Sequence, residues 1–333
     1  MARPRRSSTP EAGFTLMELL IGLAVMAIAV VYMLESVTFG NRTYTVLDQV
    51  VESQQSMRAV ASLLEYDLRH AGMMVPLGAA VCGVDSTAAP DQLYVSDVDA
   101  IDPGSDIAPY DGAIIGGGLT NVTGSSASIS VDRLILEPAP PTRAAYDVSG
   151  DGTPDSDFQV GGGVIIVDLD DPGRGTVCGR IDAIDLGASS ISIDPLVTPG
   201  LTAAGTARLV AIPAHQYRIV NGDELRRDEM LLSSGVEDLQ LAYFIDADGD
   251  AVLDAGEMKG DSSGNTYAAQ GTDIEDLREI RLNLVVRTRA EDDEFTGELQ
   301  TTENRAAAGG DGFRRRVHTT SVLPRNLFGR LGS

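Results

Sequence analysis

The residues best placed to do chemistry form one acidic segment, from Asp246 to Glu257. Oxygen donors recur at positions 1, 3, 5, 7, 9 and 12 of this segment, and they belong to Asp246, Asp248, Asp250, Val252 (through its carbonyl), Asp254 and Glu257. Calcium prefers about six to eight oxygen ligands, and this spacing lets one chain segment wrap around a single ion. Carboxylates so close together repel one another without a cation. The pattern predicts an EF-hand-like calcium loop, and a solvated acidic hairpin is the alternative.

The surroundings of this segment depart from an EF-hand. Ala251 stands where glycine is usual, at a position that favours a positive φ. The residues before the loop, from Leu239 to Phe244, have the pattern of a strand rather than a helix. We therefore expect the loop to connect strands.

A second acidic segment is a weaker calcium candidate. Its oxygen donors stand at positions 1, 3, 5 and 9, and they belong to Asp147, Ser149, Asp151 and Asp155. Gly152 is at the sixth position, but the segment lacks a clear closing glutamate. An ordinary Asp/Gly turn is the alternative interpretation.

A membrane segment precedes both loops. An apolar run extends from Phe14 to Leu34 behind a leader that carries Arg3, Arg5 and Arg6. As a helix this run is about 30 Å long, which matches the hydrocarbon core of a bilayer. By the positive-inside rule, the basic flank places the N-terminus in the cytoplasm and the rest of the chain outside it.

Glu18 is an ionisable residue inside this apolar run. A carboxylate there costs about 2.5–3.5 kcal/mol on insertion scales, so a dedicated partner is expected. The string Gly13-Phe14-Thr15-Leu16-Met17-Glu18 resembles the class III signal of type IV pilins and pseudopilins. The resemblance implies that prepilin peptidase cuts after Gly13 and methylates the new N-terminal Phe14. It also implies that Glu18 pairs with the α-amino group of a subunit and sets the axial register of assembly.

The pattern beyond the apolar run predicts a long helix followed by a sheet. Proline is absent from Glu11 to Val75, and apolar residues keep a helical spacing up to Arg69, before Gly72 and Pro76. Short strand-like runs then alternate with turn residues; they are 92–95, 133–136, 163–169, 176–184, 190–193, 207–212, 217–220, 239–244 and 280–287. We expect an α+β fold, with the long N-terminal helix packed on a mostly antiparallel β-sheet domain. The expected parts are a leader (1–13), a helix (14–72, with 14–34 in the membrane or fibre core) and a β-rich domain (73–333).

Several segments narrow the pilin resemblance to the PilW type of minor pilin. The helix end is similar at Arg58, Leu64, Asp67, Leu68, Arg69, Ala71 and Gly72, with Cys82 after it, and further similarity lies at 131–136, 235–243 and 316–326. Asp67 and Arg69 cannot face each other on one helix, so we expect them to bind different neighbours. Residues 98–130 show no such similarity and read as an insertion.

The resemblance implies a minor pilin that joins other minor pilins to prime or cap a type IV pilus and presents a surface at its tip. Its implied partners are the other minor pilins, the major pilin, the inner-membrane assembly platform, prepilin peptidase and a tip adhesin. The implied location is a single pass through the inner membrane with a periplasmic domain, then the cell surface. A type II secretion minor pseudopilin is the nearest alternative, and a membrane-anchored, calcium-dependent adhesive module is an alternative of another class.

Composition excludes other functions. The formal net charge of −24 argues against a nucleic-acid partner, which needs a basic surface. The segment from Gly260 to Gly264 and the distant His215 lack the sequence context of a serine protease, so we expect no enzyme. Cys82 and Cys178 would lie in an oxidising compartment, which favours a disulfide over two buried thiols.

Overall fold

The computed structural model describes residues 15–100, 112–116, 125–136, 145–171, 174–197, 208–250, 252–254, 256–262, 264–267 and 274–328. The chain forms two units, Met1–Val51 and Glu52–Ser333. The boundary falls inside the N-terminal helix, so the helix contributes its first part to one unit and its second part to the other.

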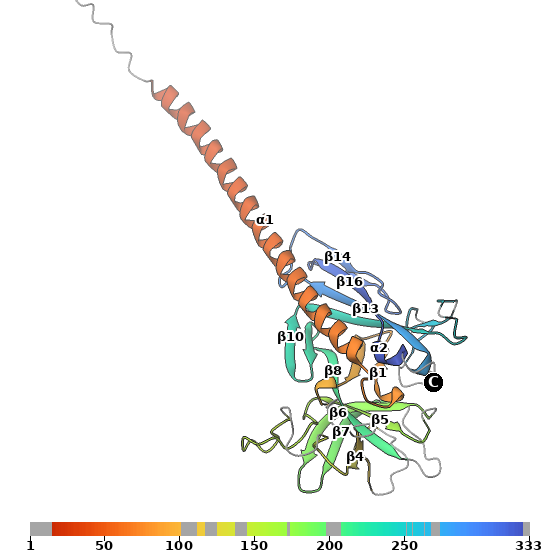
Figure 1. Cartoon of the computed structure of the whole chain (residues 1–333). Coiled ribbons are helices and arrows are strands. Elements are labelled where there is room, and N and C mark those ends of the chain that lie inside the picture. The colour runs from red at the N-terminus through yellow and green to blue at the C-terminus, as the bar shows by residue number, and fades with distance from the viewer. Residues whose placement is uncertain are drawn as a thin grey trace, which may run out of the picture. The chain divides into compact units, whose positions relative to one another are not determined.

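The N-terminal helix α1 runs from Leu16 to His70 without a break (Figure 1). The long helix expected from the absence of proline is confirmed, and Gly40 does not interrupt it. Gly72 follows the helix end with a φ of 78°, a left-handed conformation that glycine adopts at little cost.

The C-terminal segment caps α1. The side chain of Asn326, in the short helix α2 (Arg325–Phe328), donates hydrogen bonds to the carbonyls of His70 (3.1 Å) and Ala71 (3.2 Å). The last carbonyls of a helix have no partner within the helix itself. A residue more than 250 positions along the chain therefore completes the end of α1.

Among the described residues, ten strands form the larger sheet, all paired antiparallel. They are β1 (Val81–Val84), β2 (Gln92–Ser96), β3 (Ala113–Ile114), β4 (Ala127–Ser130), β5 (Gly163–Asp168), β6 (Thr176–Asp185), β7 (Ser190–Val197), β8 (Leu209–Val220), β9 (Glu224–Arg227) and β10 (Met230–Ser234). The main order is β1-β2-β8-β5-β6-β7-β4, with β3 and β9 also paired to β8 and β10 paired to β9. The 3₁₀ turns η1 (Leu77–Ala79) and η2 (Val98–Ala100) flank β1 and β2.

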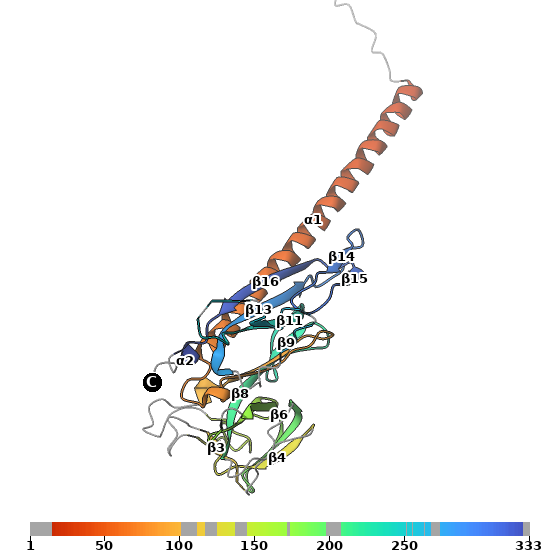
Figure 2. The ribbon, with the colours of Figure 1, turned by 90° about the vertical axis from the view of Figure 1, so that its right-hand side faces the viewer.

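In the part of the chain that the structure describes, a second sheet of four antiparallel strands has the order β12-β11-β13-β16. Figure 2 labels β11, β13 and β16 of this sheet. Its strands are β11 (Val236–Ile245), β12 (Met258–Lys259), β13 (Leu277–Arg287) and β16 (Arg315–Val322). A hairpin of β14 (Gly297–Leu299) and β15 (Ala308–Asp311) and the turn η4 (Ile274–Asp276) complete this region. The antiparallel α+β fold class is confirmed.

The second part of α1 supplies one wall of the main hydrophobic core. Its buried stripe consists of Met57, Val60, Ala61, Leu64 and Leu68. On β13, the alternating residues expected to share a face are buried in the same core, together with residues of β1, β2, β8 and β11; they are Ile280, Leu282 and Leu284. Burial of one such leucine stabilises the fold by roughly 1.5–3 kcal/mol, so this stripe fixes the helix on the domain.

One buried polar contact ties α1 to the larger sheet. The hydroxyl of Tyr217 on β8 donates to Asp67, and Arg227 on β9 lies 3.4 Å from the same carboxylate. Arg69 instead pairs with Glu65 on its own helix, at 3.0 Å. Asp67 thus ties the helix to a neighbouring sheet as expected, whereas the expectation that Arg69 would tie it to another neighbour is wrong, because Glu65 lies one turn away on the same helix.

Two strand predictions need correction. Residues 133–136 form no strand, because their backbone groups bond to Asp157 instead of a strand partner: the Leu134 carbonyl accepts from the amide of Asp157, and the amide of Leu136 donates to its carboxylate. The runs 207–212 and 217–220 are not separate: β8 continues through Pro213, whose carbonyl accepts from the amide of Asp97 at 2.9 Å. Strands β3 and β4, which pair with β8 and β7, lie within the segment interpreted as an insertion.

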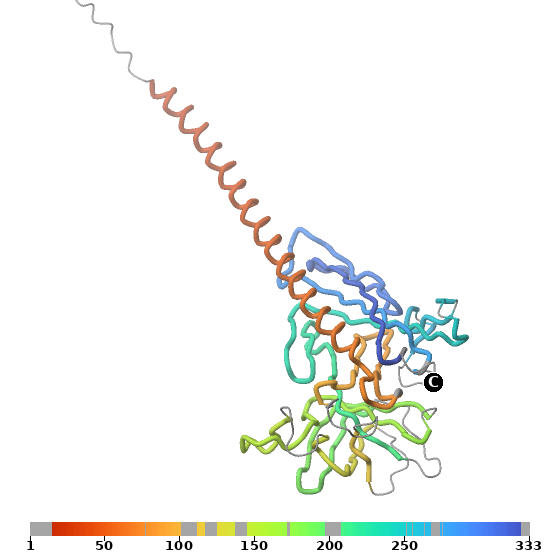
Figure 3. Tube along the Cα trace, viewed as in Figure 1, coloured from red at the N-terminus to blue at the C-terminus, as the bar shows by residue number. Residues whose placement is uncertain are grey.

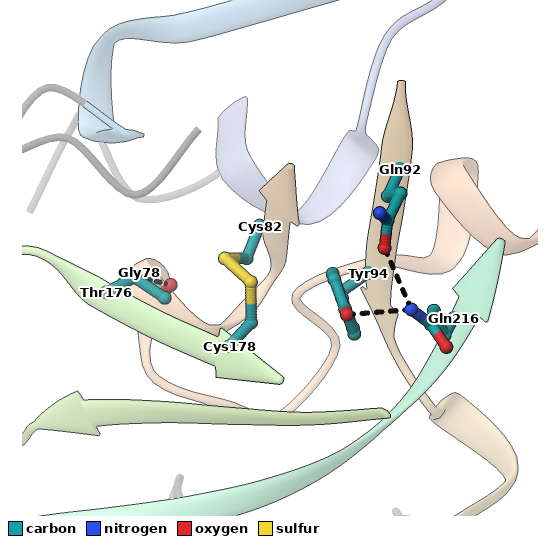
Figure 4. Close-up of a disulfide and its surroundings, with 7 residues drawn as sticks. All are labelled: Gly78, Cys82, Gln92, Tyr94, Thr176, Cys178 and Gln216. Carbon is teal, nitrogen blue, oxygen red and sulfur yellow. Dashed lines mark hydrogen bonds between the residues drawn. A yellow bond between two sulfur atoms is a disulfide. The ribbon is translucent and has the colours of Figure 1, made fainter. Parts of the chain in front are cut away.

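The predicted disulfide is present. Cys82 on β1 and Cys178 on β6 are bonded, with both residues fully buried and their Cα atoms 6.2 Å apart (Figure 4). Beside it, the hydroxyl of Thr176 donates to the carbonyl of Gly78. The bridge joins two strands of the larger sheet that are not neighbours.

We predict that replacing both cysteines by alanine lowers the free energy of unfolding by about 2–5 kcal/mol, because the bridge closes a long loop and restricts the unfolded chain. Urea unfolding of the full chain in detergent, followed by tyrosine fluorescence, measures the change. Reduced wild type should unfold near the same urea concentration as the variant, and reductant should not affect the variant. Equal stability of the variant and the oxidised wild type would contradict the prediction.

Candidate functional site

The start of α1 is held by a reciprocal capping box. The amide and hydroxyl of Thr15 donate to the Glu18 carboxylate, each at 2.9 Å, and the Glu18 amide donates to the Thr15 hydroxyl at 3.3 Å. This pattern satisfies amide groups that have no partner within the helix. Glu18 therefore has a local role that the sequence motif did not reveal. The predicted processing residues Gly13 and Phe14 lie outside the described residues.

The first part of α1 exposes apolar side chains on every face. Large examples are Leu16, Met17, Leu19, Leu20, Ile21, Leu23, Val25, Met26, Ile28, Val30, Val31, Tyr32, Met33 and Leu34. The helix is long and apolar enough to cross a membrane. An apolar surface this extensive needs lipid or other apolar helices around it.

The first acidic loop links β11 to β12, so strands flank it as expected. Carboxylate oxygens of Asp246, Asp248 and Asp250 lie within 4.8 Å of one another. Asp246 is buried and pairs with Arg278 at 2.9 Å, whereas Asp248 and Asp250 are exposed. The structure thus brings the first three predicted ligands together.

The closing glutamate of this loop is engaged with the backbone. One oxygen of Glu257 accepts from the amide of Ala247 at 3.1 Å, and the other accepts from the amide of Asp254 at 2.8 Å. Val252 is exposed, and Ala251 lies outside the described residues. Glu257 holds the two ends of the loop together, so the compact acidic group is the set of three aspartates at its start.

The second acidic loop is also compact. Oxygens of Asp147, Asp151 and Asp155 lie within 4.8 Å of one another. Asp147 accepts from the amides of Gly150 (2.6 Å) and Gly152 (2.7 Å), and Asp155 accepts from the amide of Ser149 (2.9 Å). Hydrogen bonds from Thr153 lower the pKa of Asp151. These bonds describe an Asp/Gly turn that satisfies its own carboxylates.

A cavity that the sequence did not indicate lies beside His215 on β8. Nδ1 of His215 is 2.8 Å from Asp228, and Nε2 is 3.3 Å from Asp97. Burial alone would lower the pKa of His215, but hydrogen bonds with Asp228 and Asp97 outweigh it and raise the pKa to about 9. The adjoining cavity has a volume of about 270 Å³. Among the described residues no serine lines this cavity, and the partners of His215 there are two aspartates.

Two family models match the chain. The model of the prokaryotic N-terminal methylation motif matches residues 9–34, which include the capped start of α1. The model described as type IV pilus-assembly protein W, or PilW, matches residues 203–326, from before β8 to the residue that caps α1. The two matches support a type IV pilin-like protein of the PilW type.

A solved structure is also similar to this chain. It is a type IV-like pilin from Thermus thermophilus, with 13% sequence identity and a TM-score of 0.30, covering 82% of this chain and 96% of that one. A TM-score this low adds nothing to the fold assignment, which rests on the helix and the strand pairing. No curated protein sequence matches the chain significantly.

The paired His215 predicts a loss of stability at alkaline pH. Its folded pKa of about 9 lies above the ordinary value of 6.5, so its contribution is full below pH 6.5 and is lost as the pH rises through about 9. Between these pH values, the free energy of unfolding of wild type should fall by up to about 3 kcal/mol more than that of His215→Asn.

Urea unfolding of both full-length proteins in detergent, repeated across this pH range, measures the difference. Asp91 also destabilises the fold as the pH rises, because its burial raises its pKa to about 8. Wild type and variant share this effect, so the comparison between them removes it. Parallel pH profiles for wild type and variant would show that His215 is not charged in the folded state.

Proposed function

We propose that this PilW-type chain is a minor pilin that assembles with other minor pilins to prime or cap a type IV pilus and presents its β-rich domain at the tip. The observation that carries the proposal is the capped helix α1, whose first part exposes apolar side chains on every face and has one carboxylate, Glu18, near its start. Such a surface suits two environments in turn, a bilayer and a bundle of similar helices.

Membrane insertion comes first in this proposal. The basic leader holds the N-terminus in the cytoplasm, α1 crosses the inner membrane and the domain lies in the periplasm. The Cys82–Cys178 disulfide suits that oxidising compartment. Prepilin peptidase then removes residues 1–13 and leaves a methylated Phe14.

Assembly follows through the same helix. In a fibre, Glu18 would lie among apolar side chains of neighbouring subunits, where an unpaired charge is costly. The α-amino group of a neighbouring Phe14 is the cation that fits this carboxylate. The pair would let a subunit enter at one axial position only, beside the major pilin and above the inner-membrane assembly platform.

The size of the domain supports a position at the tip. The unit from Glu52 to Ser333 has an expected radius of gyration of about 19 Å, whereas packed helices lie about 8–10 Å apart. Domains of this width would clash if every helix of a packed bundle carried one. At the end of a filament, a single domain has fewer neighbouring domains. There it can contact other minor pilins and a tip adhesin at the cell surface.

We predict that Glu18→Gln is processed normally but enters filaments at least tenfold less than wild type, because it cannot neutralise a buried amine. Thr15→Val is the matched control: it removes the capping hydroxyl but keeps Glu18, and should enter filaments at near wild-type levels. Immunoblots of sheared filaments give the incorporation, and mass spectrometry checks that each variant begins at methylated Phe14. An equal loss of filament incorporation in both variants would contradict the prediction and show that Glu18 acts only as a helix cap.

Deletion separates this proposal from its alternatives. Loss of piliation with intact protein secretion supports a minor pilin, and the reverse supports a minor pseudopilin of type II secretion. Loss of attachment with normal piliation and secretion supports a membrane-anchored, calcium-dependent adhesive module.

We further propose that the first acidic loop binds calcium. Asp246, Asp248 and Asp250 would supply the nearest oxygens, with Val252, Asp254 and Glu257 completing the set after the backbone bonds of Glu257 rearrange. The second loop, with Asp147, Ser149, Asp151 and Asp155, is the weaker candidate because backbone amides already occupy Asp147 and Asp155. Calcium would neutralise carboxylates and stiffen these loops.

Asp248→Ala tests the first loop, because Asp248 is exposed whereas Asp246 also pairs with Arg278. We predict a dissociation constant of about 10⁻⁴ to 10⁻³ M for calcium in wild type, as in extracellular modules, and at least tenfold weaker binding in the variant. Calorimetry of the full chain in detergent measures both values. The exposed Asp182→Ala is the charge-matched control, and absence of binding heat in wild type would end the calcium proposal.

A further inference from the structure

The cavity beside His215 is lined mainly by charged side chains from distant parts of the chain. Its lining residues are Asp97, Asp99, Ala100, Ala145, Tyr146, Asp157, Gln159, His215, Arg227, Asp228 and Met230. Asp97, Asp157, His215 and Asp228 are buried, whereas Asp99 and Met230 are exposed. The described residues of the two acidic loops, 147–155 and 246–257, are not part of this lining, so it is a separate feature.

The charges of this lining favour a cation. Four aspartates face two cationic residues, His215 and Arg227. His215 is already held between Asp97 and Asp228, and Arg227 also lies beside Asp67, which is outside the lining. The excess of carboxylates disfavours an anionic ligand.

The arrangement of the carboxylate oxygens in this lining disfavours a bare metal ion. In the part of the chain that the structure describes, the groups of three acidic residues with converging oxygens are those of the two acidic loops. The lining also contains apolar surface from Ala100, Ala145, Met230 and the Tyr146 ring. A ligand that matches both features has an alkyl chain and a cationic head.

The environment of Tyr146 agrees with this assignment. Burial and the nearby carboxylates of Asp97, Asp228 and Asp99 raise the pKa of Tyr146 to about 12. Its hydroxyl stays protonated at neutral pH, and its aromatic ring is a surface on which an ammonium or guanidinium group can stack. The ring of Tyr146 thus supplies apolar surface close to the carboxylates of Asp97, Asp99 and Asp228.

We propose that this cavity binds an alkyl ammonium or alkyl guanidinium group, with Asp99 at its mouth as a direct partner of the cation. The group belongs either to a free amine or to a lysine or arginine side chain of a neighbouring pilin. Both sources present the same chemistry, a methylene chain along Met230 and Tyr146 and a cationic head among the carboxylates.

Agmatine, an alkyl chain with an ammonium and a guanidinium end, is the probe, and pentanoate is the anionic control. Calorimetry of the full chain in detergent should show saturable binding of agmatine and none of pentanoate. Asp99→Asn should weaken agmatine binding about tenfold, the worth of one charge-assisted hydrogen bond. Asp182→Asn, the same charge change at an exposed position of β6, should change binding less than about twofold.

Absence of saturable agmatine binding by wild type overturns the proposal, and so does an equal loss in Asp99→Asn and Asp182→Asn. Filament incorporation then separates the two sources. A lower level of Asp99→Asn in sheared filaments, with Asp182→Asn unchanged, assigns the cavity to a side chain of a neighbouring pilin. Normal incorporation of Asp99→Asn, together with its weakened agmatine binding, assigns the cavity to a free amine.

Discussion

The structure depends on one helix that must satisfy two environments. Residues 57–68 of α1 bury a single stripe in the core of the domain, whereas residues 16–34 expose apolar side chains all round. A stripe suits packing on a sheet in water, and an all-round apolar surface suits lipid or other helices. Both parts belong to one continuous helix, and its buried end contributes Leu64, Leu68 and Asp67 to the domain.

The domain holds its part of the helix with residues from both sheets. Tyr217 and Arg227 bind Asp67 from the larger sheet, Thr320 on β16 donates to Glu65 at 2.9 Å, and Asn326 caps the last carbonyls. β8 links this region to the rest of the sheet, because its beginning packs in a second core and Tyr217 packs in the core that contains the helix stripe. Figure 3 traces the course of the chain through these elements. The region matched by the PilW model therefore includes most of the helix's polar partners.

Charge is arranged around this frame in three ways. In the two acidic loops, aspartates lie at turns and accept hydrogen bonds from backbone amides, which stabilise their negative charge. Buried carboxylates such as Asp67 and Asp238 have an arginine close by, Arg227 and Arg305 respectively. In the cavity beside His215, this histidine lies between Asp97 and Asp228, and the carboxylates of Asp157 and Asp99 also belong to the lining. The 49 acidic side chains are thus compatible with a folded domain because many of them are paired with arginines or exposed.

The sequence by itself determined the features that depend on neighbours along the chain. These include the apolar helix and its end at Gly72, the alternation of Ile280, Leu282 and Leu284, and the spacing of the two acidic loops. The tertiary structure alone decided which distant groups meet: Asp97 and Asp228 on His215, Tyr217 on Asp67, and Asn326 on the end of α1. It also decided that Pro213 lies inside a strand and that residues 133–136 do not form one. Periodicity records local preference, but a contact between segments far apart depends on how strands order themselves in a sheet, and no local spacing encodes that order.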